Sequence, residues 1–341
     1  MTILVTGGAG FIGSNFILEW LKLKDEKVIN VDKLTYAGNL LNLERISSNQ
    51  HYFFEKADVC DFSRISQLFD KYKPRAIIHF AAESHVDRSI KGPSEFINTN
   101  ILGTFNLLEI IRKNYDSGYI NNDFRFIHIS TDEVYGSLGK EEKPFTEKNQ
   151  YCPNSPYSAS KASSDHLVRS YFKTYGVPSI ITNCSNNYGP YQFPEKLIPM
   201  VIKKVLERSA IPIYGDGENI RDWLYVKDHC QAIIKVLESG NSGETYNIGG
   251  NNEIKNLDLV NHIFKEIEKY YPAQDFGFST YSDLVEFVPD RPGHDKRYAI
   301  DSSKIKYQLG WQPTETFESG IKKTVKWYLE NTSWVSSLKR E

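Results

Sequence analysis

Two acidic residues stand side by side where a predicted strand ends. The segment HISTDEVYG, residues 128–136, runs from an apolar strand into a loop through Thr131, Asp132 and Glu133. Adjacent carboxylates repel each other, so the pair either faces solvent or serves a chemical purpose. If their surroundings separate their pKa values, one can donate a proton while the other accepts one. Elimination of water requires both functions, whereas a solvated acidic turn requires neither.

A tyrosine and a lysine lie four residues apart in the segment PYSASK, within a predicted helix over residues 156–176. At this spacing Tyr157 and Lys161 share one face of the helix. The ammonium favours the phenolate, and a positively charged nicotinamide would add to this effect. A tyrosine of ordinary pKa about 10 could then act as a base near neutral pH. For the spacing alone, a surface Tyr–Lys pair is the alternative.

The segment VTGGAGFIG near the N-terminus places four glycines, Gly7, Gly8, Gly10 and Gly13, between a strand and a helix. Glycines there allow a tight turn and a close approach to a pyrophosphate, and the helix N-terminus adds N–H groups and partial positive charge. Asp32 follows about 20 residues later, where a carboxylate binds both ribose hydroxyls. Because a carboxylate repels a 2′-phosphate, the sequence favours NAD over NADP.

Three further residues bear on this dinucleotide site. Lys33 directly follows Asp32 and weakens the preference for NAD, because its positively charged ammonium could bind the 2′-phosphate of NADP. Asp58 and Val59 end the third predicted strand, within reach of an adenine ring. An ordinary turn at the end of a strand is the alternative interpretation of these two residues.

Short β-rich runs alternate with longer helical runs in the first half of the chain. Strands are expected at residues 3–7, 27–32, 51–55, 75–82 and 124–130, and helices at 11–23, 62–72 and 98–113. Such alternation predicts a doubly wound, Rossmann-type parallel sheet in an α/β fold. We expect an NAD-binding domain over residues 1–187, with its sheet completed by segments near 211–250. A smaller, mainly substrate-binding C-terminal lobe is expected over residues 188–341.

Composition excludes some classes of function. Lys and Arg number 41 against 43 Asp and Glu, a net charge of −2 that argues against a general nucleic-acid or membrane binder. No signal peptide or bilayer-spanning run is expected. The four cysteines contain no CxxC pair, which indicates free thiols in a cytoplasmic protein. No spacing of His, Cys or carboxylates suggests a metal site.

The motifs TGGAGFIG and YSASK resemble those of the extended short-chain dehydrogenase/reductase family. Six further segments, spread over nearly the whole chain, are similar to the nucleotide-sugar 4,6-dehydratases of that family. They are VDKLTYAGNL, FAAESHVDRSI, STDEVYG, SNNYGPYQFPEKLIP, GDGENIRDWLYVKDH and DRPGHDKRYAID. The resemblance implies an NAD-dependent lyase acting on dTDP-glucose. Such an enzyme oxidises C4, eliminates water across C5 and C6, and returns the hydride to C6.

The resemblance also implies a role for each catalytic residue. Tyr157 would be the acid/base at O4, and Lys161 would orient it and the cofactor ribose. Thr131 would hold the substrate hydroxyl. Asp132 would donate the proton to the departing C6 hydroxyl, and Glu133 would accept the C5 proton.

Two sets of binding residues are implied in the same way. The cofactor contacts would be Gly7, Gly10, Phe11, Ile12, Gly13, Asp32, Lys33, Leu34, Thr35, Asp58, Val59, Phe80, Ala81, Ala82, Ser84, Thr99, Tyr157, Lys161 and Asn187. The substrate contacts would be Ser84, Thr131, Asn186, Lys196, Leu197, Pro212, Ile213, Tyr214, Arg221, Asn256, Asp290, Arg291 and His294. Arg221 and Arg291 suit a diphosphate because a guanidinium is a planar, permanently charged fork. Residues 212–214 would line the base pocket.

The family further implies a homodimer in which the Tyr157 helix and its neighbour form a four-helix bundle with their mates. Three alternatives remain at this point: a dehydratase for another nucleotide sugar, a UDP-sugar 4-epimerase, and a non-catalytic dinucleotide sensor. An epimerase would have no use for Asp132 and Glu133. The choice of thymine over uracil follows from the resemblance alone. The sequence leaves open which deoxysugar, rhamnose or another, is finally made.

Overall fold

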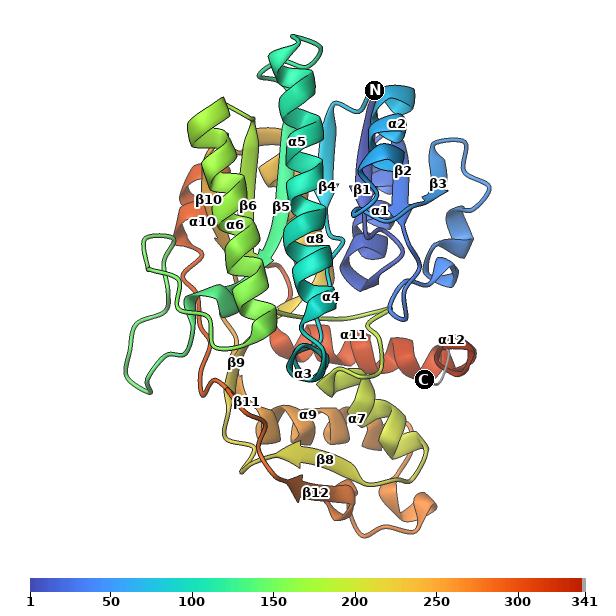
Figure 1. Ribbon diagram of the computed structural model, residues 1–341. Coiled ribbons are helices and arrows are strands. Elements are labelled where there is room, and N and C mark those ends of the chain that lie inside the picture. The colour runs from blue at the N-terminus through green and yellow to red at the C-terminus, as the bar shows by residue number, and fades with distance from the viewer. Residues whose placement is uncertain (339–341) are drawn as a thin grey trace.

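The computed structural model describes residues 1–338, and a parallel sheet dominates the N-terminal half (Figure 1). Within those residues seven strands pair in the order β10-β6-β5-β4-β1-β2-β3. They are β1 (Thr2–Thr6), β2 (Lys27–Asp32), β3 (Tyr52–Lys56), β4 (Ala76–His79), β5 (Arg125–Thr131), β6 (Ser179–Cys184) and β10 (Thr245–Ile248). The order reverses between β1 and β4. A doubly wound sheet binds ligands at the carboxyl ends of the strands on either side of such a reversal.

Helices cover both faces of this sheet (Figure 1). One face carries α2 (Phe62–Tyr72), α5 (Gly103–Asp116) and α6 (Pro156–Tyr175), and the other carries α1 (Phe11–Leu23) and α8 (Val226–Ser239). Alternate residues of each strand join the two apolar cores: Ile3 and Val5 pack against α1, and Leu4 packs against α5. Because both faces of each strand are buried, the sequences of the strands are nearly continuous apolar runs.

A smaller lobe lies below the sheet in Figure 1 and has its own apolar core. One small sheet has the order β11 (Glu253–Lys255), β9 (Ile220–Tyr225) and β7 (Asn186–Tyr188), and another pairs β12 (Val285–Val288) with β8 (Ile211–Tyr214). Its main helices are α7 (Leu197–Leu206), α9 (Asn256–Glu268) and α11 (Phe317–Glu330). Shorter helices of the chain are α3 (Val86–Lys91), α4 (Ser94–Phe96), α10 (Ser303–Leu309) and α12 (Thr332–Ser337). Four 3-10 segments occupy Leu40–Ile46, Asp132–Tyr135, Ala273–Phe276 and Tyr281–Leu284.

The predicted doubly wound fold is confirmed. The helix predicted over residues 98–113 instead begins as a π-helical segment, Ile97–Leu102, before α5. Of the segments near 211–250 that were expected to complete the sheet, β10 joins it, whereas β8 and β9 form the smaller sheets. The division at residue 187 remains a proposal, and the last three residues of the expected C-terminal lobe lie outside the described residues. No helix among residues 1–338 is long and apolar enough to cross a membrane.

Candidate active site

A cavity of about 290 Å³ lies at the carboxyl ends of the sheet strands. Of the predicted cofactor contacts, its wall includes Gly7, Gly10, Phe11, Ile12, Gly13, Asp32, Lys33, Thr35, Asp58, Val59, Phe80, Ala81, Ala82, Ser84, Thr99, Tyr157, Lys161 and Asn187. Leu34 does not line this cavity. Its backbone, at a positive φ of 59°, donates instead to the Asp32 carboxylate at 2.8 Å.

The glycine turn between β1 and α1 is packed so closely that it has no room for side chains at Gly7 and Gly13. A Cβ on Gly7 would lie 2.5 Å from the Ala81 nitrogen, and one on Gly13 would lie 2.3 Å from the Gly7 carbonyl oxygen. Gly10 is the N-cap of α1 and offers no side chain to the free N–H groups of the first turn. These N–H groups and the helix dipole suit a pyrophosphate, so the turn fits a dinucleotide.

The carboxylate of Asp32 is fixed at the end of β2. Its two oxygens accept hydrogen bonds from the backbone N–H groups of Ala9 at 3.0 Å and Leu34 at 2.8 Å. Burial raises the pKa of Asp32, and these two hydrogen bonds oppose the rise. The Lys33 ammonium lies 3.5 Å from Asp58 and 3.4 Å from the Thr99 hydroxyl, and its charge also opposes the rise in the pKa of Asp32. The end of β2 therefore presents a fixed carboxylate to a ribose, with the Lys33 ammonium on the same cavity wall.

Strand β5 and helix α6 bring the catalytic residues together. Thr131 ends β5, and its hydroxyl accepts from the Glu133 N–H at 3.3 Å, which starts the 3-10 turn that carries both acids. Ser155 and Ser158 form a capping box that begins α6 directly before Tyr157. All five predicted catalytic residues, Thr131, Asp132, Glu133, Tyr157 and Lys161, line the one cavity.

The two adjacent acids have different surroundings. Burial raises the pKa of Asp132 well above its ordinary value, and the carboxylates of Glu133 and Asp222 raise it further. Burial also raises the pKa of Glu133, but the cations Arg291, Lys196 and Arg221 oppose this rise. Asp132 is therefore the stronger candidate for a protonated acid, and Glu133 for an ionised base.

The surroundings of Tyr157 bear on its expected role as a base. Burial raises the pKa of Tyr157 well above its ordinary value, and the Glu133 carboxylate adds to the rise. Lys161 donates its hydrogen bond to the Ile129 carbonyl at 2.8 Å, and burial lowers its pKa to about 8. Burial therefore favours the phenol, and the predicted phenolate stays a prediction that includes the positive charge of a nicotinamide.

The predicted substrate contacts divide into two groups. Ser84, Thr131, Asn186 and Lys196 line the cavity, and Lys196 donates to the Ser84 carbonyl at 3.0 Å. A second group forms a polar cluster beside α3. There Tyr214 donates to Asp87 at 3.1 Å, Arg291 lies 3.5 Å from Asp87, and His294 lies 2.5 Å from Asp290. Arg291 faces Glu133 closely enough to lower its pKa, which links the cluster to the catalytic acids.

Other predicted substrate contacts lie in less open positions. Ile213 packs in the core of the smaller lobe, because β8 alternates buried and exposed residues, and only Pro212 and Tyr214 are exposed beside it. Leu197 packs against the same core. Asn256 begins α9 and bonds through its backbone to the Asn219 carbonyl at 3.0 Å.

Arg221 is buried, with 5% of its surface exposed, and stacks at 4.3 Å over the Tyr298 ring. Its guanidinium donates to three backbone carbonyls, those of Ile220, Asp295 and Lys296. If Arg221 bound a diphosphate, its guanidinium N–H groups would be shared between the phosphate oxygens and these three carbonyls. Its charge still acts on both catalytic acids, whose pKa values it lowers.

The sequence interpretation missed several groups on the cavity wall. Glu83, Cys184, Gln192 and Glu195 all line it. Cys184 ends β6, and the rule that strand ends line the crevice could have identified it. Asp222, which raises the pKa of Asp132, carries no comparable signal. Among residues 1–338 no group of three His, Cys, Asp or Glu side chains could hold a metal ion.

The chain is similar to known proteins over nearly its whole length. The sequence model of the family described as GDP-mannose 4,6 dehydratase matches residues 4–324. A dTDP-glucose 4,6-dehydratase of Salmonella typhimurium is 56% identical over 349 residues, which cover 99% of this chain and 96% of that protein. The chain belongs to the dTDP-glucose 4,6-dehydratase family.

Two solved structures of dTDP-glucose 4,6-dehydratases are similar over the whole chain. The Bacillus anthracis enzyme in complex with NAD has a TM-score of 0.88 and 46% identity, covering 99% of this chain and 100% of its own. The Streptomyces venezuelae enzyme with NAD and TYD bound has a TM-score of 0.90 and 43% identity, with the same coverage. The resemblance drawn from the sequence motifs is thus confirmed.

Proposed function

We propose that the chain is an NAD-dependent dTDP-glucose 4,6-dehydratase, a lyase that forms dTDP-4-keto-6-deoxy-glucose and water. The observation that carries this proposal is the difference between Asp132 and Glu133 in one cavity with Tyr157 and Lys161. An enzyme that only oxidises and reduces C4 needs a tyrosine and a lysine. A neighbouring acid and base, held in different protonation states, add the means to eliminate water.

The cofactor fits the residues present. The close-packed turn of Gly7 and Gly13 leads into α1, whose first-turn N–H groups suit a pyrophosphate, and Asp32 presents a carboxylate for the ribose hydroxyls. The chemistry that NAD supplies when bound is acceptance of the C4 hydride, its return to C6 and a positive charge beside Tyr157. Because burial favours the phenol of Tyr157, a positive charge next to the ring lowers its pKa toward the range in which it accepts a proton.

The chain's own residues then move the protons. Tyr157 accepts the O4 proton, and Thr131 holds the same hydroxyl. The C4 ketone acidifies the neighbouring C–H, so ionised Glu133 removes the C5 proton. Protonated Asp132 gives its proton to the C6 hydroxyl, which leaves as water. After the hydride has returned to C6, Glu133 gives its proton back to C5 and O4 remains a ketone oxygen. The proton that Tyr157 took is released to solvent, and Asp132 takes one up, which restores both groups.

For the wider substrate site, we extend the proposal to the polar cluster of Tyr214, Asp290, Arg291 and His294. Its support is that the cluster continues from the catalytic acids to β8 in the smaller lobe. Arg291 would bind the diphosphate together with Lys196, and Tyr214 would lie beside the base.

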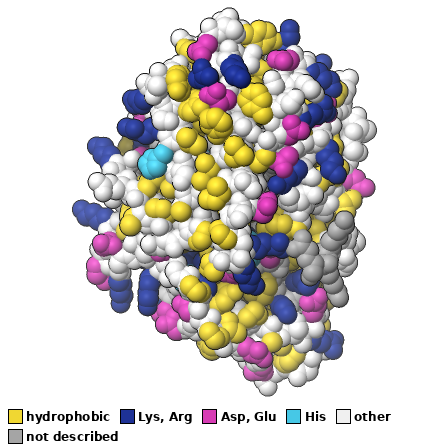
Figure 2. Space-filling view, viewed as in Figure 1, with side chains coloured by type: hydrophobic (Ala, Val, Ile, Leu, Met, Phe, Trp, Pro, Cys, Tyr) yellow, Lys and Arg dark blue, Asp and Glu magenta, His cyan; other side chains and the backbone are white. Residues whose placement is uncertain are grey.

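We also propose that the chain forms a homodimer through α5 and α6. Figure 2 shows hydrophobic side chains along the middle of the face on which α5 and α6 lie in Figure 1. Ile97, Leu102 and Phe105 are 48%, 44% and 39% exposed there. Ile97 and Leu102 lie in the π-helical segment before α5 and Phe105 lies on α5, and exposed apolar side chains there suit a helix bundle with a second copy. A monomeric mass in light scattering would overturn the dimer.

A cytoplasmic location and a place in the synthesis of deoxysugars such as rhamnose complete the proposal. The four cysteines are free thiols, two of them buried, which suits a reducing compartment. Detection of the tagged protein in the membrane or periplasmic fraction would overturn the location.

The function is tested with dTDP-glucose deuterated at C4. We expect a 4-keto-6-deoxy sugar with the deuterium at C6, identified by mass spectrometry and NMR. Deuterium that stays at C4 in an epimerised sugar would indicate a 4-epimerase instead. Turnover of GDP- or UDP-sugars, but not of dTDP-glucose, would contradict the nucleotide assignment.

A further inference from the structure

Asp165 is a buried carboxylate that takes no part in the proton transfers described above. It lies on α6 four residues after Lys161 and is 1% exposed. Side chains at this spacing share one face of a helix, so both approach the same strand ends. Burial of a carboxylate costs free energy unless charge or hydrogen bonds compensate for it. The position therefore requires a physical explanation.

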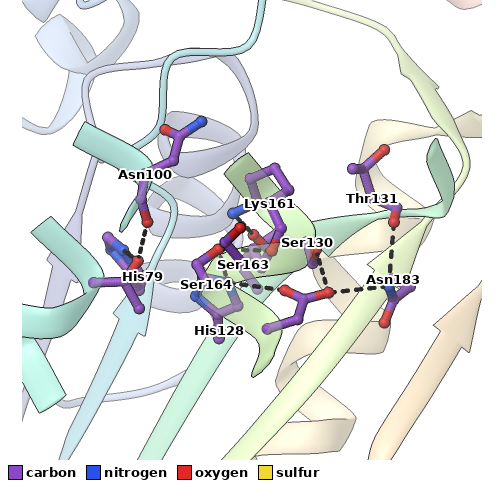
Figure 3. A network of polar contacts seen from close by, with 12 residues as sticks. His79, Asn100, His128, Ser130, Thr131, Lys161, Ser163, Ser164 and Asn183 are labelled. Carbon is purple, nitrogen blue, oxygen red and sulfur yellow. Dashed lines mark hydrogen bonds and ion pairs between the residues drawn. The ribbon is translucent and has the colours of Figure 1, made fainter. Parts of the chain in front are cut away.

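Hydrogen bonds connect Asp165 to the end of β5. Its Oδ2 accepts from the Ser130 hydroxyl at 2.8 Å and from the Asn183 amide at 3.4 Å. The same Asn183 amide donates to the Thr131 carbonyl at 3.1 Å. Figure 3 shows Ser130, Thr131, Lys161 and Asn183 in this network between the strand ends and α6. The carboxylate is thus coupled to the residue that directly precedes the two catalytic acids.

Lys161 is bound to the same strand. Its ammonium donates to the carbonyl of Ile129, the residue before Ser130, at 2.8 Å. The network of Lys161, Asp165 and Asn183 therefore holds three consecutive residues of β5, which are Ile129, Ser130 and Thr131. Displacement of Lys161 would move the end of the strand that carries Thr131.

The other titratable groups around Lys161 and Asp165 are neutral near pH 7. They are His79 on β4, His128 on β5, Tyr151 before α6, Tyr157 on α6 and Cys184 on β6. Burial lowers the pKa values of the two histidines and raises those of the tyrosines and the thiol. His128 Nε2 lies 3.1 Å from Asp165 Oδ1. Ionised Glu133 acts on Tyr157 in the same cavity, whereas Asp165 is the carboxylate whose charge raises the pKa of Lys161.

We propose that Asp165 is a positioning residue, whose buried carboxylate is the counter-charge that keeps Lys161 an ammonium and holds it at the end of β5. The inference rests on the proposed function, in which Lys161 acts beside Tyr157. Burial raises the pKa of Asp165 to about 6 and lowers that of Lys161 to about 8, while each charge opposes the shift of the other. Both groups are therefore charged between these two values.

The test is the isosteric variant Asp165→Asn, studied by two readouts. The first is the titration of the Lys161 side chain, followed by NMR of carbon-13 at lysine Cε and assigned with Lys161→Met. We expect its midpoint to fall from near 8 by about one unit or more, because a nearby opposite charge contributes shifts of that size. The second is the pH profile of turnover, whose alkaline limb should move to lower pH by a similar amount.

Glu109→Gln is the matched control. Glu109 is a carboxylate on the neighbouring helix α5 that accepts from Tyr171 of α6 at 2.6 Å, so its loss also removes a charge from the helix pair. We expect the Lys161 titration to be unchanged in this variant. A folded Asp165→Asn protein with an unchanged Lys161 midpoint would overturn the inference.

Ser130→Ala keeps the test decisive if Asp165→Asn does not fold. It removes a hydrogen bond to the ionised carboxylate, so the pKa of Asp165 should rise above about 6. Lys161 should then lose its counter-charge at a higher pH, so the change in the lysine Cε chemical shift that accompanies protonation of Asp165 should move to higher pH. A Cε signal of Lys161 that shows no change in this range would contradict the proposal. Failure of the wild type to convert dTDP-glucose would contradict the function instead, and the NMR titration would still judge Asp165.

Discussion

The two walls of the cavity differ in how their polar groups find partners. On the cofactor wall, both oxygens of Asp32 bind backbone N–H groups that lie within 23 residues of it. On the substrate wall, Asp132 Oδ2 and Asn186 Oδ1 are buried without a hydrogen-bond partner among residues 1–338, and so is Arg291 Nε in the polar cluster beside that wall. The first wall is completed by local segments, whereas the second presents polar atoms that a substrate can bind. Buried polar atoms without a partner require an explanation, and binding of a polar substrate supplies one here.

The charges of the two walls differ as well. Around the catalytic acids, the groups that separate their pKa values come from distant parts of the chain, namely Lys196, Arg221, Asp222 and Arg291. Charged residues of the smaller lobe therefore determine which of the two acids is protonated, although Asp132 and Glu133 directly follow the end of β5. Variants on each wall should affect different steps of the reaction.

The largest effect is expected for Tyr157→Phe. Loss of the phenolic oxygen removes the base for O4, which should lower kcat by about 10²–10⁴-fold. The ring remains in place, so KM for dTDP-glucose should change little. Single-turnover absorbance of the reduced cofactor measures the oxidation step directly. A kcat within a few-fold of wild type would contradict the role of Tyr157.

The double variant Asp132→Asn with Glu133→Gln separates the two half-reactions. It should suppress dehydration by about 10²-fold or more, since both the acid and the base for elimination are lost. Oxidation at C4 should persist, because Tyr157 and Lys161 are unchanged. The reduced cofactor should therefore accumulate in a single turnover. Full dehydration by this variant would show that other groups eliminate the water.

Gly13→Ala tests the cofactor wall alone. The added Cβ would lie 2.3 Å from the Gly7 carbonyl oxygen, so the turn must move. We expect the free energy of unfolding to fall by about 1–3 kcal/mol and the affinity for NAD to weaken. Calorimetry and a titration with NAD measure the two effects. In the control Gly92→Ala, the nearest atom would lie 4.0 Å from the new Cβ, and both quantities should stay near wild type.

The smallest effect is expected for Arg291→Met, in the polar cluster beside the substrate wall. Arg291 lowers the pKa of Glu133, so its loss should raise that pKa. Glu133 must be ionised to remove the C5 proton, and its activity is lost as the pH falls through its pKa. The acid limb of kcat should therefore move to higher pH, by about one unit. An acid limb that moves equally in the exposed-surface control Arg45→Met would contradict this explanation.

The local part of the structure could be predicted from the sequence. Helix α1 spans Phe11–Leu23 and helix α2 spans Phe62–Tyr72, and both ranges are those predicted from the sequence. The glycines, Asp32 and the pair Tyr157 and Lys161 also lie where the motifs indicate, because short-range spacing determines which face of an element they share.

The rest depended on contacts between distant residues. Nothing in residues 128–136 shows that Asp222 stands near Asp132, or that Arg291 stands near Glu133. The burial that raises the pKa of Tyr157, and the Glu133 carboxylate that adds to the rise, likewise follow from the folded structure and not from the spacing of Tyr157 and Lys161. The family motif predicts that Ile213 lines the base pocket, yet buried and exposed residues alternate along β8, and the side chain of Ile213 packs in the core.

The most direct test of the central claim is a titration of the two acids in the folded protein. Carbon-13 NMR of the side-chain carboxyl groups, assigned with Asp132→Asn and Glu133→Gln, would follow each acid separately. We predict that Asp132 remains protonated to higher pH than Glu133, so that near neutral pH one is an acid and the other a base. If Glu133 instead held its proton to higher pH than Asp132, the assignment of donor and acceptor would be contradicted.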